Sequence, residues 1–254
     1  MKTLVVNNQK GGVGKTMLAC HLAWFLAEAE GARVGVFDFD LQGNASKVLS
    51  KAHRGGLSSA LFKGPDFPAK PAAPGITIFK ADSDLNYVEE NDVKPAAERF
   101  KAIADRFDYV VIDTPPSWGW RNFAALYVAD HLLSPIDLEQ FALDGVTALR
   151  KNLGIVEGFR EDGRKVDFMG LLASRYQSGS PHQKDNLKGL FQTYGALMFD
   201  GVVTQRQGYA QAMVAQAPVW TLPSSAQREA GKELRAILTR VKDRMDNVTQ
   251  ERTA

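Results

Sequence analysis

A glycine-rich loop with two lysines lies near the start of the 254-residue chain. Residues 10–16 read Lys-Gly-Gly-Val-Gly-Lys-Thr, directly after an apolar run at 4–6 and directly before a helix-like stretch at 17–29. Glycines let backbone N–H groups curl around an anion, and a following helix directs its positive end at the same anion. Lys15 can reach the β- and γ-phosphates of a nucleotide, and the Thr16 hydroxyl can bind Mg²⁺. The loop therefore predicts a site for nucleotide phosphates.

The loop departs from two standard phosphate-binding patterns. The pattern G-x-x-x-x-G-K-[ST] has glycine where this chain has Gln9, and a dinucleotide site would need glycine or alanine at Met17. Its distinctive feature is the additional lysine, Lys10. The residues predicted to surround the phosphates are Gly11, Gly12, Val13, Gly14, Lys15, Thr16 and Met17.

Acidic residues follow two further apolar runs. Residues 38–44 read Asp-Phe-Asp-Leu-Gln-Gly-Asn, and residues 113–116 read Asp-Thr-Pro-Pro after the run at 109–112. Mg²⁺ and an attacking water both need carboxylate or amide oxygens of this kind. A strand that ends in aspartate is the Walker B arrangement, in which Asp113 holds Mg²⁺ through Thr16 or through water.

Lys10 with this glycine spacing resembles the deviant Walker A loop, KGGxGK[ST], of the ParA/MinD family of dimeric ATPases. The resemblance implies that the chain binds ATP and Mg²⁺. It also implies that Lys10 reaches across a dimer interface to the nucleotide of the partner. Residues 113–116 are similar to the second switch of the family, which senses the γ-phosphate and meets the partner subunit.

Residues 38–44 are similar to the D-x-D-P-Q-G-N switch of the same family, with Leu41 in place of proline. Proline fixes φ and leucine does not, so the replacement loosens this loop. The resemblance implies that Asp40 positions or activates the attacking water. It implies that Asp38 lies in the outer shell around Mg²⁺. The residues predicted for the metal site are Thr16, Asp38 and Asp113.

Hydrolysis of ATP requires positioned water and positive charge on the phosphate oxygens. The catalytic residues that we expect are Lys10, Lys15 and Asp40. Because Lys10 would act from the partner subunit, a monomer should hydrolyse ATP poorly and a dimer better, as with an arginine finger supplied in trans. Slow basal turnover follows, and a slow ATPase of this kind suits a timed switch.

Short β-branched runs alternate with longer segments of helical period. This rhythm predicts an α/β fold with a mostly parallel, twisted sheet and helices on both faces, here of the deviant Walker P-loop type. Ligands bind at the carboxyl ends of the strands in such sheets. The predicted strands are 3–6, 33–37, 76–79, 109–112, 131–134 and 166–173, and Gly64–Pro74 reads as a loop.

Composition limits the alternatives. A chain of 254 residues fits one large α/β domain, and we expect one domain over 1–254 without an N-terminal helix-turn-helix unit. The formal net charge of +2 permits nucleic acid as a partner without requiring it. A single cysteine, Cys20, excludes internal disulfides and an iron–sulfur site. The sequence has no signal pattern and no apolar stretch of about 18 residues, so we expect a cytoplasmic protein.

The second half of the chain indicates what such an ATPase would act on. Residues 134–151 and 201–219 look like segments of partition proteins, and the latter implies a strand, a short helix and part of a nonspecific DNA surface. The interpretation is a ParA-type DNA partition ATPase that forms an ATP-dependent homodimer, associates with the nucleoid, and is stimulated by a centromere-binding partner of the ParB type. The predicted DNA contacts are Arg175, Lys184, Lys188 and Arg206, with Lys232, Arg235 and Arg240 as further basic residues.

Three other interpretations stay open on the sequence. A MinD-like ATPase would bind membranes, but the apolar stripe of the last helix predicts a core-facing surface and the final residues are polar. A ParA-like ATPase that positions a protein cargo on the nucleoid would share every motif described. A metabolic P-loop ATPase, such as a metal-insertion factor, would be expected to carry cysteine or histidine ligands. His21 and His182 lack a metal-ligand partner at useful spacing. The predicted stripe is Leu234, Ile237, Leu238, Val241, Met245 and Val248.

Overall fold

One eight-stranded sheet forms the centre of the computed structural model, which describes residues 1–64, 72–138 and 143–253. Every strand pairing in it is parallel. The strand order is β3-β4-β2-β5-β1-β6-β7-β8. The strands are β1 (Lys2–Val6), β2 (Arg33–Asp38), β3 (His53–Leu57), β4 (Gly75–Lys80), β5 (Tyr109–Asp113), β6 (His131–Asp137), β7 (Asp167–Tyr176) and β8 (Met198–Thr204).

All six strands predicted from apolar runs are confirmed, and so is the α/β class. β8 agrees with the strand that the resemblance implied near 201–204. The edge strand β3 was not predicted, because its sequence, His-Arg-Gly-Gly-Leu, has neither an apolar run nor alternation. The predicted loop at 64–74 lies partly outside the described residues.

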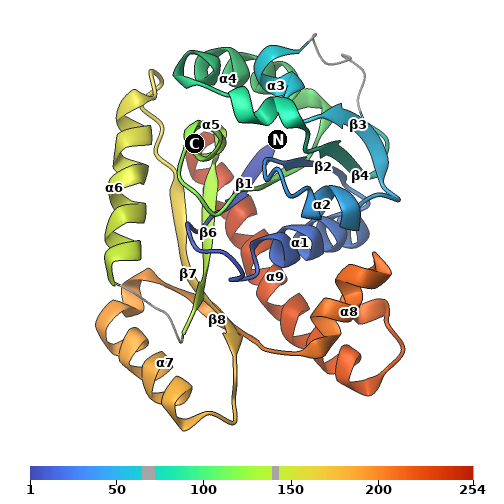
Figure 1. The fold of residues 1–254 in the computed structure, drawn as a ribbon, viewed down its shortest axis with the longest axis vertical. Coiled ribbons are helices and arrows are strands. Elements are labelled where there is room, and N and C mark those ends of the chain that lie inside the picture. The colour runs from blue at the N-terminus through green and yellow to red at the C-terminus, as the bar shows by residue number, and fades with distance from the viewer. Residues whose placement is uncertain (65–71, 139–142, 254) are drawn as a thin grey trace.

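Helices cover both faces of the sheet (Figure 1). One apolar cluster packs α1, α8 and α9 against one face, and a second packs α4, α5 and α6 against the other. None of the described helices combines the length and apolar character needed to cross a membrane. The helices are α1 (Lys15–Glu30), α2 (Asn44–Val48), α3 (Ala60–Lys63), α4 (Val93–Ala102), α5 (Trp120–Val128), α6 (Leu143–Phe159), α7 (Pro181–Tyr194), α8 (Gln207–Ala215) and α9 (Ser225–Thr253).

The last helix, α9, crosses behind the sheet in Figure 1 and contributes a continuous buried stripe. Its exposed fractions are 0–2% at Leu234, Ile237, Leu238, Val241 and Met245, which confirms that this stripe faces the core. The side chain of Val248 lies outside the described set. Near its end the helix is held to the first strand, where the Lys2 ammonium contacts Asp246 at 2.5 Å.

A buried histidine joins α1 to the segment after α8. His21 Nδ1 donates to the Met17 carbonyl at 2.8 Å, and His21 Nε2 accepts from the Val219 N–H at 3.2 Å. The imidazole is enclosed by aromatic rings, with Trp24 at 5.1 Å and Trp220 at 5.7 Å between ring centroids. His21 is therefore a packing residue of the core. Cys20 beside it is also buried in α1.

Burial lowers the pKa of His21 to about 4, whereas an exposed histidine titrates near pH 6.5. The unfolded chain therefore binds more protons between these values, and the free energy of unfolding falls as the pH drops from about 6.5 to about 4. A pKa shift of this size lowers the free energy of unfolding by about 3 kcal/mol at most. Urea unfolding at pH 7.5 and pH 5 measures it.

The control for this experiment is a pair of variants. His21→Met should flatten the pH dependence relative to wild type, although it lowers stability at pH 7.5 by leaving the Val219 N–H without its acceptor. His182→Gln, which changes an exposed histidine on α7, should keep the wild-type slope. An unchanged slope in His21→Met would contradict the assignment.

Candidate functional site

The carboxyl edge of the sheet brings the predicted phosphate and acidic motifs together. In the register of β2 and β5, Asp38 is the Cα partner of Asp113. In the register of β1 and β5, Asp113 is also the partner of Val6, the last residue of β1, three positions before the segment that begins at Lys10. The ends of β1, β2 and β5, up to about a hundred residues apart in the chain, therefore lie at the same level of the sheet. Asp38 and Asp113 are both fully buried there.

The glycine-rich loop turns directly into α1. Gly12 has φ +77° and Gly14 has φ +96°, a left-handed backbone that favours glycine. Gly14 is the N-cap of α1, so the N–H groups of the first turn lie next to the loop. The residues predicted to surround phosphates, 11–17, thus form a tight loop over 11–14 and the start of α1 over 15–17.

Lys15 lies inside this loop. Its ammonium donates to the Lys10 carbonyl at 2.8 Å, which spans the loop from within. Only 7% of Lys15 is exposed, and burial lowers the pKa of its ammonium, while the carboxylates of Asp113 and Asp40 oppose that shift. A buried ammonium is unfavourable unless a negative charge pairs with it. The loop itself supplies no such charge, and phosphate oxygens would, so the site suits an anionic ligand.

A hydroxyl and two carboxylates lie beside the loop. Thr16 Oγ1 donates to Asp113 Oδ2 at 2.7 Å. Asp38 Oδ2 accepts from both the N–H and the hydroxyl of Ser46, at 2.8 and 2.6 Å. Burial and the neighbouring Asp38 carboxylate raise the pKa of Asp113 to about 8. Two neighbouring buried carboxylates repel each other when both are ionised. Both can therefore ionise together only when a cation binds beside them.

The residues present fit a magnesium ion bound together with a nucleotide. Asp113 Oδ1 is buried and has no hydrogen-bond partner among the described residues. The same part of the chain contains no group of three or more histidine, cysteine or acidic side chains that could hold a metal. Mg²⁺ does not need such a group, because it keeps several waters and binds through one or two protein oxygens and the phosphates. Thr16 and Asp113 would supply those oxygens.

The loop after β2 places Asp40, which is half-buried, beside this edge. Asp40 Oδ1 accepts the Gln42 N–H at 3.0 Å, and the Gly43 N–H donates to the Asp40 carbonyl at 2.8 Å. Gly43 has φ +62°, so a glycine is needed to close this turn. Leu41, which replaces the proline of the family pattern, has an exposed fraction of 37%.

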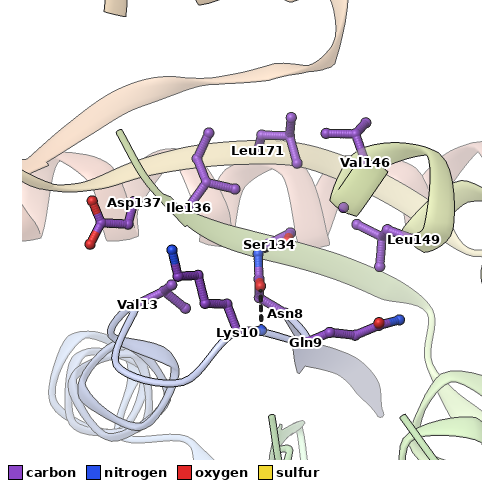
Figure 2. A pocket seen from close by; sticks show the side chains of 11 residues that line it. Asn8, Gln9, Lys10, Val13, Ser134, Ile136, Asp137, Val146, Leu149 and Leu171 are labelled. Atoms are coloured by element: carbon purple, nitrogen blue, oxygen red, sulfur yellow. Dashed lines mark hydrogen bonds between the residues drawn. The ribbon is translucent and has the colours of Figure 1, made fainter. Parts of the chain in front are cut away.

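Lys10 lies on the other side of the loop, facing a cavity of about 290 Å³. Figure 2 shows its side chain extending from the loop toward Ile136 and Asp137, whereas the Lys15 ammonium bonds back to the Lys10 carbonyl. The Lys10 N–H donates to Asn8 Oδ1 at 2.8 Å, which holds the start of the loop. The two lysines of the motif therefore point in different directions.

Sequence reasoning missed a buried amide network behind the site. Asn7 Nδ2 donates to Asn122 Oδ1 at 2.5 Å and to Thr114 Oγ1 at 3.1 Å. Thr114 in turn donates to the Val6 carbonyl at 2.8 Å. An asparagine directly after an apolar strand was the available signal, since a buried amide needs partners. The partners could not be identified, because Asn122 lies 115 positions away.

Arg121 was also missed. It lies in the first turn of α5 and donates through Nη1 to the Phe39 carbonyl at 3.1 Å, between Asp38 and Asp40. No motif contains it, and an arginine near a helix start has no sequence signature of its own.

The four predicted DNA contacts lie in different environments. Lys184 and Lys188 are exposed and four residues apart on α7. Arg206 is paired with Glu233 at 3.3 Å. Arg175 lies against the phosphate loop, with Nη1 3.5 Å from the Gly12 carbonyl and 3.4 Å from Asp137. The nucleotide motifs are thus brought together, and these four cations are not brought to one site.

Known proteins share this architecture. Residues 4–219 match the model of the CobQ/CobB/MinD/ParA nucleotide binding domain. The chain is 35% identical over 255 residues to Protein IncC of Escherichia coli, covering 97% of this chain and 70% of that protein. It is 30% identical to chromosome partitioning protein ParA of Caulobacter vibrioides, covering 96% of each. The solved McdA(D38A)–ATP complex of Cyanothece has a TM-score of 0.76 at 19% identity, covering 94% of this chain and 96% of that one.

The loop geometry predicts different effects of alanine at two of its glycines. A Cβ on Gly14 would lie 3.2 Å from the buried Ser174 hydroxyl, on a backbone at φ +96°. Gly14→Ala should therefore reduce the free energy of unfolding by about 1–3 kcal/mol. A Cβ on Gly11 meets nothing within 4 Å, so Gly11→Ala should stay within about 0.5 kcal/mol of wild type. Urea unfolding without nucleotide compares them, and equal losses would contradict the described loop.

Proposed function

The chain belongs to the family of CobQ/CobB/MinD/ParA nucleotide-binding domains, and from that premise we propose that it is a ParA-type DNA partition ATPase. ATP and Mg²⁺ bind at the carboxyl edge of the sheet. The single observation that carries the proposal is the Thr16 hydroxyl at 2.7 Å from the buried Asp113, at the mouth of a glycine loop that encloses Lys15. The chromosome partitioning protein among the relatives supports the biological role.

Each residue of the site has a separate task in this proposal. The loop 11–17 and the first turn of α1 bind the phosphates through backbone N–H groups. Lys15 neutralises charge on the β- and γ-phosphates, and Thr16 with Asp113 holds Mg²⁺, which supplies further positive charge. Asp40, half-buried in the loop after β2, orients the attacking water. Asp38, whose carboxylate is bound by Ser46, keeps that loop at the edge of the sheet.

Lys10 acts on the nucleotide of a partner subunit. Its side chain extends toward Asp137 and Ile136 (Figure 2). A lysine in this position has no task in its own phosphate cradle, which Lys15 already fills. ATP-dependent dimerisation then completes each site, so basal turnover of the separate subunit is slow.

A nonspecific DNA surface belongs to the same proposal. Lys184 and Lys188 of α7 are its main contacts, because both are exposed and lie on adjacent turns. Arg206 contributes less, since Glu233 already balances its charge at 3.3 Å. A ParB-type partner stimulates hydrolysis and releases the protein from DNA, so that its place is on the nucleoid in the cytoplasm. A protein cargo would use the same cycle and would differ only in the partner.

Two substitutions separate nucleotide binding from hydrolysis. Asp40→Ala should reduce ATP hydrolysis by at least about 100-fold, because the attacking water loses its acceptor. The same variant should bind random-sequence duplex DNA with ATP and not with ADP, since its ATP dimer persists. Lys15→Ala should lose both nucleotide binding and DNA binding.

The control is Asp84→Ala, which changes an exposed aspartate away from the site and should behave as wild type. Hydrolysis at the normal rate by Asp40→Ala would refute the assignment of Asp40. A dimeric, ATP-bound Asp40→Ala protein that ignores DNA would refute partition, and binding to liposomes instead would favour a MinD-like role.

DNA binding should fall with salt concentration, with a slope near −0.9 per neutralised phosphate in a plot of log affinity against log salt. Lys184→Gln with Lys188→Gln should weaken binding to all sequences and reduce that slope by about 2 per subunit. Fluorescence anisotropy over a salt series measures both quantities. Lys232→Gln, on α9, is the control, and an equal effect of that substitution would move the DNA surface away from α7.

A further inference from the structure

We propose that Arg121 is a positioning residue of the ATPase site, which ties the loop that carries Asp40 to the first turn of α5. The proposal deepens the function given above and rests on it, because it concerns the same hydrolysis reaction. Arg121 lies outside all the nucleotide motifs of the chain. Its contact is the Phe39 carbonyl, which Nη1 reaches at 3.1 Å.

The Phe39 carbonyl that Arg121 binds lies at the start of the loop that carries Asp40. It belongs to the planar peptide that joins Phe39 to Asp40, so fixing its oxygen also fixes the Asp40 N–H on the other side. That N–H donates to Asp38 Oδ1 at 3.2 Å. The preceding peptide is held as well, because the Phe39 N–H donates to the Asp113 carbonyl at 3.0 Å. Arg121 therefore controls the last fixed peptide before Asp40.

The side chain of Phe39 leaves little freedom on the opposite side of this peptide. It is fully buried, and its ring lies 5.3 Å from Phe62 and 6.3 Å from Phe37. The chain beyond it is exposed at Leu41 and Gln42. Movement of the loop relative to the sheet must therefore begin at the peptide that Arg121 holds.

Charge supports the same arrangement. Arg121 is half-buried, and burial lowers the pKa of its guanidinium, while the Asp40 carboxylate opposes that shift. A guanidinium keeps its charge under such conditions. Arg121 is thus a fixed positive group beside the loop that carries Asp40, in addition to its bond to the Phe39 carbonyl.

The other end of this connection is the segment that follows Asp113. Asn122, next to Arg121 on α5, donates to the Ser117 carbonyl and accepts from Asn7 at 2.5 Å. The first turn of α5 consequently holds the segment after Asp113 through one side chain and the loop after Asp38 through the next. The same turn of helix thus contacts both loops at this edge of the sheet.

Arg121→Gln tests the proposal, with Arg99→Gln as a matched control. Arg99 Nη1 donates to the Phe62 carbonyl at 2.6 Å, which is the same type of bond at a distance from the nucleotide edge. Arg121→Gln should lower kcat for ATP hydrolysis by about 10- to 100-fold. KM and the Kd of a non-hydrolysable ATP analogue should not change. Arg121→Lys should recover part of kcat, because lysine keeps the charge and one donor without the planar fork. Arg99→Gln should keep the wild-type kcat.

A second readout needs no ATP. Hydrogen–deuterium exchange of the nucleotide-free protein should become faster in residues 40–44 of Arg121→Gln and stay at the wild-type rate in Arg99→Gln. This measurement also separates the two proposals. If wild type proves to have no ATPase activity, the proposed function fails, and the exchange rates still decide whether Arg121 holds the loop.

Three results would overturn the inference. An unchanged kcat in Arg121→Gln would show that the bond does not position Asp40. A lower kcat with unchanged exchange in 40–44 would assign Arg121 to the phosphates directly. A higher KM and a higher analogue Kd at constant kcat would make Arg121 a binding residue. If urea unfolding shows that Arg121→Gln is not folded, Arg121→Lys carries the same three comparisons, with a smaller expected loss of kcat.

Discussion

The pairing of β2, β5 and β1 in one parallel register is the constraint on which the site depends. It places Asp38 and Asp113 opposite each other at the end of the sheet, where neither is accessible to water. Two neighbouring buried carboxylates are unfavourable in their ionised forms unless a cation lies beside them. The hydroxyl of Thr16 satisfies one oxygen of Asp113, and the other oxygen has no hydrogen-bond partner among the described residues. The folded protein therefore contains a site that gains stability when a divalent cation binds with the nucleotide.

The elements around this edge hold it through side chains that come from distant parts of the chain. Asn7, Thr114 and Asn122 form a buried network behind the phosphate loop. Arg121 reaches the peptide before Asp40. On the far side of α1, His21 joins the helix to Val219. The phosphate loop is thus supported along its helix and at both neighbouring loops, which is the rigidity that positioning a water molecule demands.

Much of this could be predicted from the sequence, and the reason differs between parts. The central strands are apolar and buried on both faces, so their runs are visible without any structure. The glycine loop, Asp40 and Asp113 follow those runs directly, so a local pattern was enough to place them at one edge. β3 lacks an apolar run and was missed. The bonds of Arg121, Asn122 and His21 were missed because each joins residues that are far apart in the chain, and such pairs leave no periodic trace.

The position of β1 in the sheet has a consequence for how the chain is made. β1 precedes β5 and β6 in the chain and is synthesised before them, yet it lies between these two strands, and Leu4 pairs with His131. Contacts of such high sequence separation form slowly, and N-terminal segments leave the ribosome first. We expect the glycine loop to remain without its neighbours until β5 and β6 have been translated. A nucleotide then has no assembled site to enter before these two strands have joined β1.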